Sequence, residues 1–355
     1  MRHCASARRE PDMTSGGGKV VALVPSGSGA SVIHRALQDA MLGYSLATYP
    51  PCWEYFPPLL RRLREPAADL VHAPPDHAVF VCPRRTPLVI TFHNYVLDRA
   101  MRRYSSVMQR LHYATDLRLY TRMALRRASV VTAVSNFTAR LLREDLRFGG
   151  PIELIPNGVD VGRFRPMDAP TQDGPLRVLF SGNLTRRKGA HLLPQIARLA
   201  GPEVEVHYTT GARAGIDEPR WAGLKAIGRV PYMDMPSLYP QFDVLLFPTI
   251  REGMSLALLE AMASGLAVVA SDAASNPELI EPGAGGLLCP VGEPQAYAAA
   301  LRRLAADRER VRRMGQHNRQ VVESRYTLER MVAGYRAVFE RVLGRPVALR
   351  DEAQP

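Results

Sequence analysis

The sequence has no long hydrophobic run and few cysteines. No stretch of its 355 residues approaches the roughly 20 apolar residues that a membrane-spanning helix needs, and no secretory signal is visible at its start. Four cysteines lie far apart, without the CxxC spacing of zinc ribbons and dithiol redox sites, which disfavours both classes of protein. Scattered cysteines in a large chain are typical of a reducing compartment, so we expect a cytoplasmic protein.

Lysine is also scarce. Only Lys19, Lys188 and Lys225 occur, so nearly all of the 46 basic side chains are arginines. The formal net charge of +12 favours anionic partners such as nucleotides, phospholipids or nucleic acid. An arginine-rich proteome would give the same balance, and both explanations stay open. The hydrophobic content of 46% is ordinary for a globular protein, and the length suits two domains of about 150 residues each.

Apolar runs typical of buried parallel strands alternate with helical patterns in both halves of the chain. This alternation predicts two parallel α/β domains. Between them, residues 161–175 carry three prolines and little periodicity, which indicates a linker. The expected strands lie at 19–25, 68–74, 87–94, 129–135, 152–160, 176–182, 204–210, 243–249 and 267–271. One expected helix begins near residue 31, and the others cover residues 98–128, 136–145, 189–200, 254–264 and 294–343.

Open α/β sheets bind ligands at the carboxyl ends of their strands, and glycines follow the first strand here. Backbone N–H groups near Gly27 and Gly29 would be able to approach a phosphate or a sugar. A dinucleotide fingerprint would need a third glycine at position 32, which is Val32, so a nicotinamide oxidoreductase is disfavoured. A plain strand-to-helix turn explains the loop equally well.

Two further strand ends carry polar residues. His93 ends the run LVITFHN and is expected to point toward a cleft, unless it only bonds a neighbouring loop. The stretch SGNLTRRKG (181–189) follows another strand, and Gly182 permits its turn. Its three cations precede a helix and would oppose the helix dipole unless an anion lies there. A bound diphosphate would attract both the cations and the positive end of the helix dipole. The alternative is that the three cations are a charge run in contact with solvent. The three cations are Arg186, Arg187 and Lys188.

The stretch REGMSLALLEAMASG (251–265) holds two glutamates separated by seven uncharged residues. Gly253 allows the chain to turn from Glu252 into a helix whose first N–H groups would meet an anion. Glu260 lies about two turns further on, among apolar residues, where a carboxylate needs hydrogen-bond donors. A ribose diol would supply two donors, and a salt bridge to a core arginine is the alternative. The N–H groups in question belong to Met254, Ser255 and Leu256.

Taken together, these motifs resemble the retaining GT-B glycosyltransferases of family 4, which carry an E-x7-E motif. The resemblance covers about residues 19–340 and implies an α/β fold of two Rossmann-like parallel domains that face a cleft. The stretches that carry it are TFHN, AVSNFT, IPNGVDVGRFRP, SGNLTRRKG, GRVPYMDMPSLYPQFDVLLFPTIREGMSLALLEAMASGLAVVAS and GGLLCPVGEP. We expect a disordered leader (1–18), an acceptor-binding domain (19–165), a linker (166–175), a nucleotide-sugar-binding domain (176–330), and a helix and tail (331–355) returning to the first domain.

The resemblance also assigns roles to residues. It implies that Glu260 binds the ribose hydroxyls, Glu252 the transferred sugar and Lys188 the diphosphate. His93 would lie over the sugar, and Gly228–Val230 would contact the base. The expected catalytic residues are His93, Glu252 and Lys188. The expected binding residues are Gly29, Gly182, Asn183, Arg187, Lys188, Arg229, Gly253, Met254, Ser255, Leu256 and Glu260.

One departure from the family concerns the phosphate site. The family usually has an arginine directly after the glycine of this motif, and here that position is Asn183. Either Arg186 or Arg187 substitutes for it, or the leaving group is stabilised less. No DxD-type acidic pair accompanies this site, so we expect no metal and no cofactor besides the nucleotide-sugar donor.

The expected function is transfer of a hexose-like sugar, with retention, in cell-surface polysaccharide or glycolipid synthesis. The alternatives are a non-catalytic nucleotide-sugar-binding protein and a transferase acting on a small soluble acceptor. The expected partners are the donor and a lipid-linked or saccharide acceptor, and no nucleic acid.

Residues 99–127 hold eight arginines and one aspartate, which predicts docking on the anionic inner face of the cytoplasmic membrane. Ordinary core helices with solvated arginines are the alternative. The expected apolar stripe is Met101, Tyr104, Met108, Leu111 and Tyr120.

Overall fold

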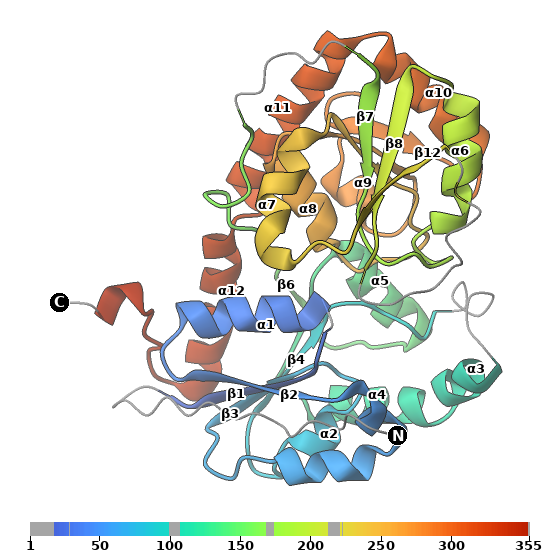
Figure 1. Cartoon of the computed structure of the whole chain (residues 1–355). Helices are drawn as coiled ribbons and strands as arrows, with labels where there is room; N and C mark the ends of the chain where they lie inside the picture. Colours follow the sequence, from blue (N-terminus) through green and yellow to red (C-terminus); the bar gives the residue numbers. More distant parts are fainter. Residues whose placement is uncertain are drawn as a thin grey trace. The chain divides into compact units, whose positions relative to one another are not determined.

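The computed structural model describes residues 18–27, 29–98, 107–167, 174–211, 221 and 223–353. These residues form two compact units (Figure 1). Unit 1 comprises Met1–Asn157 and Glu329–Pro355, and unit 2 comprises Gly158–Leu328. Each unit contains a six-stranded sheet in which every pair of neighbouring strands is parallel. The predicted fold class, two Rossmann-like parallel α/β domains, is confirmed.

The sheet of unit 1 has the order β2-β1-β3-β4-β5-β6. Its central strands β3 and β4 are buried along their whole length and β1 is buried up to its last residue, as expected for strands covered on both faces. The strands are β1 (Val20–Pro25), β2 (Tyr44–Tyr49), β3 (Leu70–Ala73), β4 (Leu88–Phe92), β5 (Val130–Ala133) and β6 (Glu153–Leu154). The helices are α1 (Gly29–Ala40), α2 (Ala78–Val81), α3 (Val107–Ala114), α4 (Asp116–Arg127), α5 (Asn136–Asp145) and α12 (Leu328–Leu343), with short 3-10 turns at Pro51–Tyr55, Pro57–Leu63 and Asp351–Ala353.

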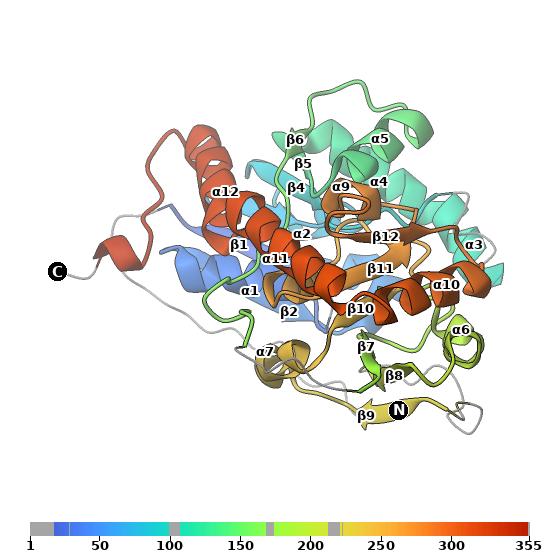
Figure 2. The same ribbon diagram turned by 90° about the horizontal axis from the view of Figure 1, so that it is seen from above.

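Unit 2 has the sheet order β12-β11-β10-β7-β8-β9, which Figure 2 shows from above. Helices α6 and α10 lie on one side of this sheet, and α7, α8 and α11 on the other (Figure 1). The strands are β7 (Leu176–Phe180), β8 (Val204–Thr209), β9 (Lys225–Gly228), β10 (Val244–Phe247), β11 (Ala267–Ser271) and β12 (Gly286–Cys289). The helices are α6 (Leu193–Ala200), α7 (Met235–Leu238), α8 (Leu256–Ala263), α9 (Asn276–Leu279), α10 (Pro294–Ala305) and α11 (Arg308–Arg325), with 3-10 turns at Ala190–Leu192, Tyr232–Asp234 and Tyr239–Gln241.

Helix α11 fixes the position of α8. A Cβ on Gly315 would overlap the carbonyl oxygen of Gly265, so only glycine allows the two backbones to approach this closely. One turn further, Arg319 Nη1 donates to the carbonyls of Ala263 (2.8 Å) and Phe164 (2.6 Å). Asn318 Nδ2 donates to the Leu266 carbonyl at 2.8 Å. The carboxyl end of α8 is therefore held by side chains of α11.

Three strands, β2, β9 and β12, were not predicted from the sequence. Each lies at the edge of its sheet, where one side of the strand has no neighbour. Their side chains are partly exposed, so they lack the continuous apolar run of a buried strand. The predicted helix at 294–343 is three helices, and Asp307 caps the second by accepting a hydrogen bond from the Arg310 amide at 2.8 Å.

The chain divides at Asn157–Gly158 rather than at the predicted linker. Val159 belongs to unit 2 because its amide donates to the Tyr326 carbonyl at 2.9 Å. Phe164 is buried in the same unit. Residues 168–173 of the predicted linker, like residues 1–17 of the predicted leader, lie outside the described residues. The return to unit 1 begins at Glu329, two residues before the predicted boundary.

Candidate functional site

The loops after β7 and β10 bring a glutamate and two cations together in unit 2. Glu252 Oε1 lies 2.8 Å from Lys188 Nζ and 2.8 Å from Arg187 Nη1. Arg187 Nη1 also donates to the Arg251 carbonyl at 2.7 Å, and the Ile250 amide donates to the Arg187 carbonyl at 2.9 Å. Because β7 and β10 are neighbours in the sheet, their carboxyl ends lie side by side. We call Glu252, Lys188 and Arg187 the ion cluster.

The ion cluster is largely shielded from water. The side chains of Glu252 and Lys188 are 15% and 14% exposed, so this is no solvated charge run. Burial by itself raises the pKa of Glu252, but the charges of Lys188 and Arg187 outweigh it and hold the pKa below its usual range. One carboxylate therefore faces two cations. The cluster has a surplus of positive charge, and the anionic ligand expected at this loop stays a prediction.

Two glycines shape the loop that carries the cations. Gly182 has φ +137° and its amide donates to Thr209 Oγ1 at 3.1 Å. Gly189 has φ +75°, and a Cβ there would overlap the Pro248 carbonyl oxygen. Any other residue would strain the backbone at both positions. Between them, Lys188 Nζ lies 5.4 Å from the centre of the Phe247 ring, a distance at which cation–π attraction operates.

Asn183, which replaces the family's arginine, packs against a neighbouring loop. A Cβ on Gly211 would overlap the Asn183 side-chain oxygen, so the two residues are in close contact. An arginine at this position would have to displace that loop or turn away from it. Of the two arginines expected to compensate, Arg187 is in the ion cluster and Arg186 is exposed.

Glu260 lies within α8 and is only 4% exposed. Tyr239 Oη donates to Glu260 Oε2 at 3.0 Å, and the Tyr232 hydroxyl also bonds this carboxyl. Among the described residues its hydrogen-bond donors are therefore tyrosines, and the salt bridge to a core arginine considered from the sequence is not formed. Arg163 lies over the Tyr232 ring, 4.9 Å from its centre, and adds its charge from outside.

The protonation of Glu260 is finely balanced. Burial raises its pKa to about 7, and the two tyrosine hydrogen bonds with the charges of Arg163 and Lys188 offset only part of that rise. The carboxyl is thus partly protonated near neutral pH. Additional hydroxyl donors would stabilise its ionised form, because a carboxylate accepts hydrogen bonds at both oxygens.

The helix that carries Glu260 begins two residues later than predicted, at Leu256. Ser255 is its N-cap, and the serine side chain makes no capping hydrogen bond. No acidic residue occupies the first turn, so the partial positive charge of the helix end is not offset there. Met254 and Ser255 are buried just before it, next in sequence to Glu252 and Gly253.

The remaining predicted residues are distributed over both units. Arg229 follows β9 and is exposed. Gly29 begins α1 in unit 1, where a Cβ would meet nothing within 4 Å. His93 follows β4 in unit 1 and bonds a second histidine, considered below. Sequence reasoning missed Tyr239 and Tyr232; a carboxylate in an apolar helix demands donors, and this demand was the signal for them.

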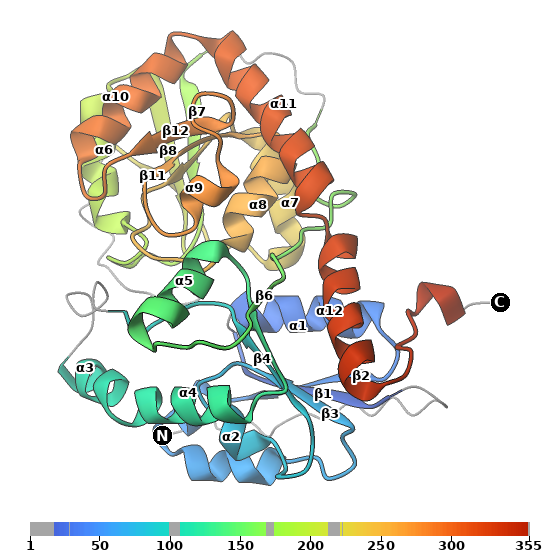
Figure 3. The same cartoon turned by 180° about the vertical axis from the view of Figure 1, so that it is seen from behind.

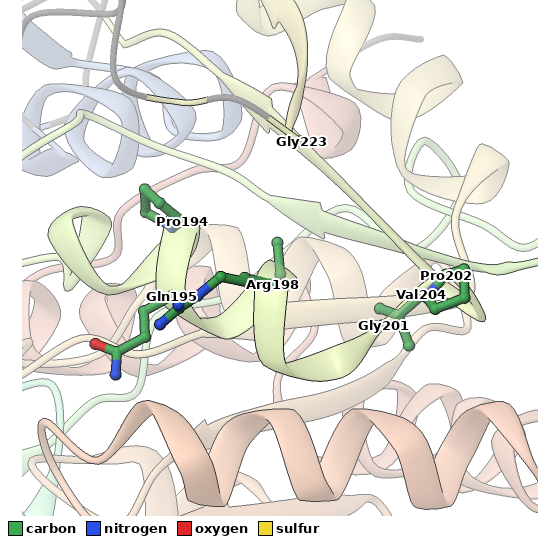
Figure 4. Close-up of a pocket in the computed structure, with 8 residues that line it drawn as sticks. Pro194, Gln195, Arg198, Gly201, Pro202, Val204 and Gly223 are labelled. Carbon is green, nitrogen blue, oxygen red and sulfur yellow. The ribbon is translucent and has the colours of Figure 1, made fainter.

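A surface cavity of about 720 Å³ lies beside α6 (Figure 4), and none of the predicted site residues lines it. Its polar side chains are those of Gln195 and Arg198. The rest of its lining is Pro194, Ala197, Gly201, Pro202, Val204 and Gly223. Within the described ranges, no group of three or more histidine, cysteine or acidic residues is placed to hold a metal ion. Over the same ranges, no helix has the length and apolar character needed to cross a membrane.

Comparison with known proteins places both halves of the chain in one group. The family described as Glycosyltransferase Family 4 matches residues 14–163, and the family described as Glycosyl transferases group 1 matches residues 175–307. The lipopolysaccharide core biosynthesis mannosyltransferase LpcC of Rhizobium leguminosarum bv. viciae is 30% identical over 265 residues, which are 68% of this chain and 71% of the relative. A phosphatidyl-myo-inositol mannosyltransferase of Mycolicibacterium smegmatis is 37% identical over 182 residues, 48% of this chain and 46% of its own length.

Solved structures share the fold at low identity. Sucrose-phosphate synthase from Thermosynechococcus elongatus matches with a TM-score of 0.76 at 18% identity, over 92% of this chain and 99% of its own. Anabaena HepE in complex with UDP-glucose matches with a TM-score of 0.71 at 20% identity, over 91% of this chain and 99% of its own. Both likenesses concern the fold.

The raised pKa of Glu260 predicts how stability depends on pH. The folded protein binds this proton up to about pH 7, whereas the unfolded chain releases it near 4.5, so its contribution to stability falls as pH rises between these values. Glu260→Gln should remove this fall. The variant should gain on the order of 3 kcal/mol relative to wild type across the window, because the pKa rises from 4.5 to about 7 and each pKa unit is worth about 1.4 kcal/mol.

Denaturant unfolding at a series of pH values checks this. Tyr239→Phe removes a hydrogen bond that favours the carboxylate and should shift the fall of wild type to higher pH. If the stability of wild type and of Glu260→Gln depended on pH in the same way, the pKa of Glu260 in the folded protein would not be raised.

Proposed function

The chain belongs to the group 1, family 4 glycosyltransferases, and we propose that it transfers a sugar from a nucleoside-diphosphate donor to a saccharide or lipid-linked acceptor with retention of configuration. The observation that carries this proposal is the ion cluster at the carboxyl ends of β7 and β10, with the buried Glu260 on the helix that follows Glu252. The relatives support it: one bears the name of a lipopolysaccharide core mannosyltransferase, and HepE was solved with UDP-glucose.

In this proposal the two cations stabilise the leaving group. Lys188 and Arg187 both contact Glu252 Oε1 in the structure. A diphosphate would compete for them, since phosphate oxygens accept the same charged hydrogen bonds. Negative charge grows on the diphosphate as the bond to the sugar breaks, so cations already in place lower the barrier. Glu252 would then be released to accept hydrogen bonds from hydroxyls of the transferred sugar.

In this proposal the donor and the acceptor are the only reactants. The bond between the sugar C1 and the diphosphate oxygen breaks, and a bond from C1 to the acceptor oxygen forms on the same face. The acceptor hydroxyl proton passes to the departing diphosphate. Glu260 would hold the ribose, whose two hydroxyls are the additional donors that favour its ionised form. The family resemblance assigns His93 of unit 1 to the sugar, and backbone N–H groups near Gly29 would be able to approach a phosphate or a sugar.

A non-catalytic nucleotide-sugar-binding protein is the competing function. Such a protein would need Glu260 and Lys188 but not Glu252 or His93. Here Glu252 is part of a buried, paired cluster, which favours an enzyme. A transferase acting on a small soluble acceptor is the second alternative, and the outer surface of unit 1 argues against it.

Helices α3 and α4 follow one another along unit 1 (Figure 3) and expose apolar side chains. On α4, Leu119 and Met123 are 55% and 43% exposed, and they share a face with the exposed Arg122 and Arg126, at helical spacings of three, four and seven. The opposite face of α4 packs inward. On α3 the same spacing applies to exposed Val107, Arg110 and Leu111.

This face differs from the stripe expected from the sequence. Tyr120 packs edge-on against Phe80, with ring centres 4.8 Å apart, so it belongs to the interior. Arg118 forms an ion pair with Asp145, and Arg127 donates hydrogen bonds to the carbonyls of Pro83 and Thr86, which precede β4. Neither arginine is therefore available to lipid. Leu111 is exposed as expected. Residues 99–106, which include Met101, Arg102, Arg103 and Tyr104, lie outside the described residues, as does the side chain of Met108.

We propose that this face docks the enzyme on the anionic inner surface of the cytoplasmic membrane. Apolar side chains flanked by arginines are the composition of an interfacial helix, and each arginine near an anionic surface contributes about 1 kcal/mol. An acceptor carried on a lipid would then lie within the same surface. The protein would be cytoplasmic and peripheral, held by charge and a few buried apolar side chains.

Replacing the two glutamates should have different effects on binding and on turnover. Glu260→Ala should weaken binding of the nucleoside diphosphate by roughly tenfold or more, because hydrogen bonds to a charged group are worth ~1.5–3 kcal/mol. Glu252→Ala should chiefly lower turnover. Titration with nucleoside diphosphates and transfer assays with a panel of nucleotide sugars measure the two effects. Glu203→Ala, an exposed glutamate, serves as control. Wild-type transfer by both site variants would refute the site assignment.

Transfer should persist in excess EDTA. Lys188 and Arg187 supply the charge that a divalent ion supplies in other transferases, and the described residues offer no metal cluster. Rates with and without chelator are compared at saturating donor, and the expected ratio is about one. Loss of activity that Mg²⁺ or Mn²⁺ restores would establish a metal requirement.

Sedimentation with vesicles tests docking. The protein should bind vesicles of mixed phosphatidylglycerol and phosphatidylcholine, and binding should fade with salt. Arg122→Glu with Arg126→Glu should weaken it at least about tenfold, from ~1 kcal/mol per arginine lost. Arg303→Glu with Arg325→Glu changes the charge equally on exposed sites of unit 2 and should bind like wild type. No binding at low salt, or equal loss in both double variants, would exclude this face as the docking surface.

A further inference from the structure

Three histidines from separate segments meet inside unit 1. His34 comes from α1, His72 from β3, and His93 from the residue after β4. The centre of the His34 ring lies 4.4 Å from the centre of the His72 ring and 5.2 Å from the centre of the His93 ring. His34 and His72 are fully buried, whereas His93 is partly exposed. The described residues hold no metal cluster here, so the contacts among the imidazoles need another explanation.

Hydrogen bonds connect the three histidines in a continuous line. His93 Nε2 lies 3.2 Å from His34 Nε2, and His34 Nδ1 lies 2.7 Å from Tyr44 Oη. Tyr44 Oη lies 2.8 Å from His72 Nδ1. Beyond His72 the line passes through two threonines, with His72 Nε2 2.7 Å from Thr91 Oγ1 and Thr91 Oγ1 2.7 Å from Thr132 Oγ1. We call these six residues the histidine relay.

The far end of the relay sets its direction. Thr132 Oγ1 donates to the Ile90 carbonyl at 3.3 Å, and a carbonyl only accepts. With the single hydroxyl proton of Thr132 directed to the Ile90 carbonyl, Thr132 accepts from Thr91, and Thr91 in turn accepts from His72 Nε2. A neutral imidazole that donates from Nε2 accepts at Nδ1, so Tyr44 donates to His72 and accepts from His34 Nδ1. His34 Nε2 then accepts, and His93 Nε2 donates to it.

Burial keeps the relay neutral, which this reasoning requires. Desolvation lowers the pKa of His34 and of His72 well below the usual value, with the neighbouring histidines adding to the effect. Burial lowers the pKa of His93 to about 4. Helix α12 closes the relay from the side: the Tyr335 and Phe339 rings lie 5.1 and 5.3 Å from His72.

We propose that the histidine relay fixes His93 as the tautomer protonated at Nε2 and presents its Nδ1 as a hydrogen-bond acceptor for a hydroxyl of the substrate. Tyr44, His72 and Thr132 are then positioning residues that act through His93. His93 Nδ1 is buried and has no hydrogen-bond partner among the described residues, so a lone pair there stays unsatisfied until a donor arrives. The part concerning the substrate rests on the proposed function; the tautomer does not.

The tautomer gives His93 a chemical preference. A neutral acceptor attracts a hydroxyl and offers nothing to a phosphate or carboxylate oxygen, which carry no proton near neutral pH. The opposite tautomer would donate from Nδ1 and reverse the preference. A residue assigned to a sugar thus gains specificity for hydroxyl groups from side chains as distant in the relay as Thr132.

The first test measures the tautomer directly in the full chain. Two-bond ¹H–¹⁵N correlation spectra of histidine-labelled protein distinguish the two neutral forms, and His93→Gln identifies the His93 signals. We expect His93 protonated at Nε2. A wild-type spectrum with His93 protonated at Nδ1 overturns the proposal, whether or not any transfer activity has been found.

The second test breaks the relay away from His93. Tyr44→Phe removes the hydroxyl that accepts from His34, so His34 should become protonated at Nε2 and force His93 to the Nδ1–H form. Tyr49→Phe, a buried tyrosine on the same strand but outside the relay, should leave the His93 signals unchanged. Thr132→Val removes the anchor and should mix the two forms. An unchanged His93 tautomer in a folded Tyr44→Phe variant overturns the proposal.

Kinetics then test the consequence for the substrate. Tyr44→Phe should lower turnover roughly fivefold to tenfold, the effect of about one neutral hydrogen bond, while affinity for the nucleoside diphosphate without sugar stays constant. Tyr49→Phe should keep the wild-type rate. Equal turnover in Tyr44→Phe and wild type, with the tautomer changed as expected, would overturn the assignment of Nδ1 to the substrate.

Discussion

The contact of Glu252 with Lys188 and Arg187 is the constraint around which unit 2 is built. A buried carboxylate without cations, or buried cations without a carboxylate, would cost several kcal/mol, so neither loop can adopt its path alone. Glycines at 182 and 189 let the first loop turn sharply enough to deliver the cations. The second loop is bonded to the first through Arg187 and Ile250. The loops after two adjacent strands are thereby held together by ion pairs and by backbone hydrogen bonds.

The histidine relay of unit 1 is held together by a different means, because its members are neutral. The histidine relay contains no formal charge, and its hydrogen bonds run from the Ile90 carbonyl to His93, whose Nδ1 has no partner among the described residues. A neutral chain of this kind avoids the desolvation penalty of buried ions, but each link depends on the next. The two units thus show two solutions to the same problem, which is how to keep polar side chains in a dry interior.

The sequence allowed the parallel sheets to be predicted, because strands alternate with helices in both halves of the chain, and the family resemblance assigned Lys188 and Glu252 to the same donor. Edge strands β2, β9 and β12 escaped, since half-exposed strands lack a continuous apolar run. The donors of Glu260 escaped as well: Tyr239 precedes it by 21 residues, and only folding brings the two together. The relay has no sequence signature, since His34, His72 and His93 are separated by whole elements.

Helix α12 belongs to unit 1, although its residues follow all of unit 2 along the chain. During synthesis the sheet of unit 1 emerges from the ribosome first, and the helix that covers His72 and Tyr44 emerges last. Unit 2, which is continuous, has its complete sequence earlier. A nascent chain that had emerged only through residue 328 would carry a complete unit 2, and a unit 1 without the helix that packs against His72 and Tyr44. Folding of the unit that begins the chain therefore waits for translation to reach α12.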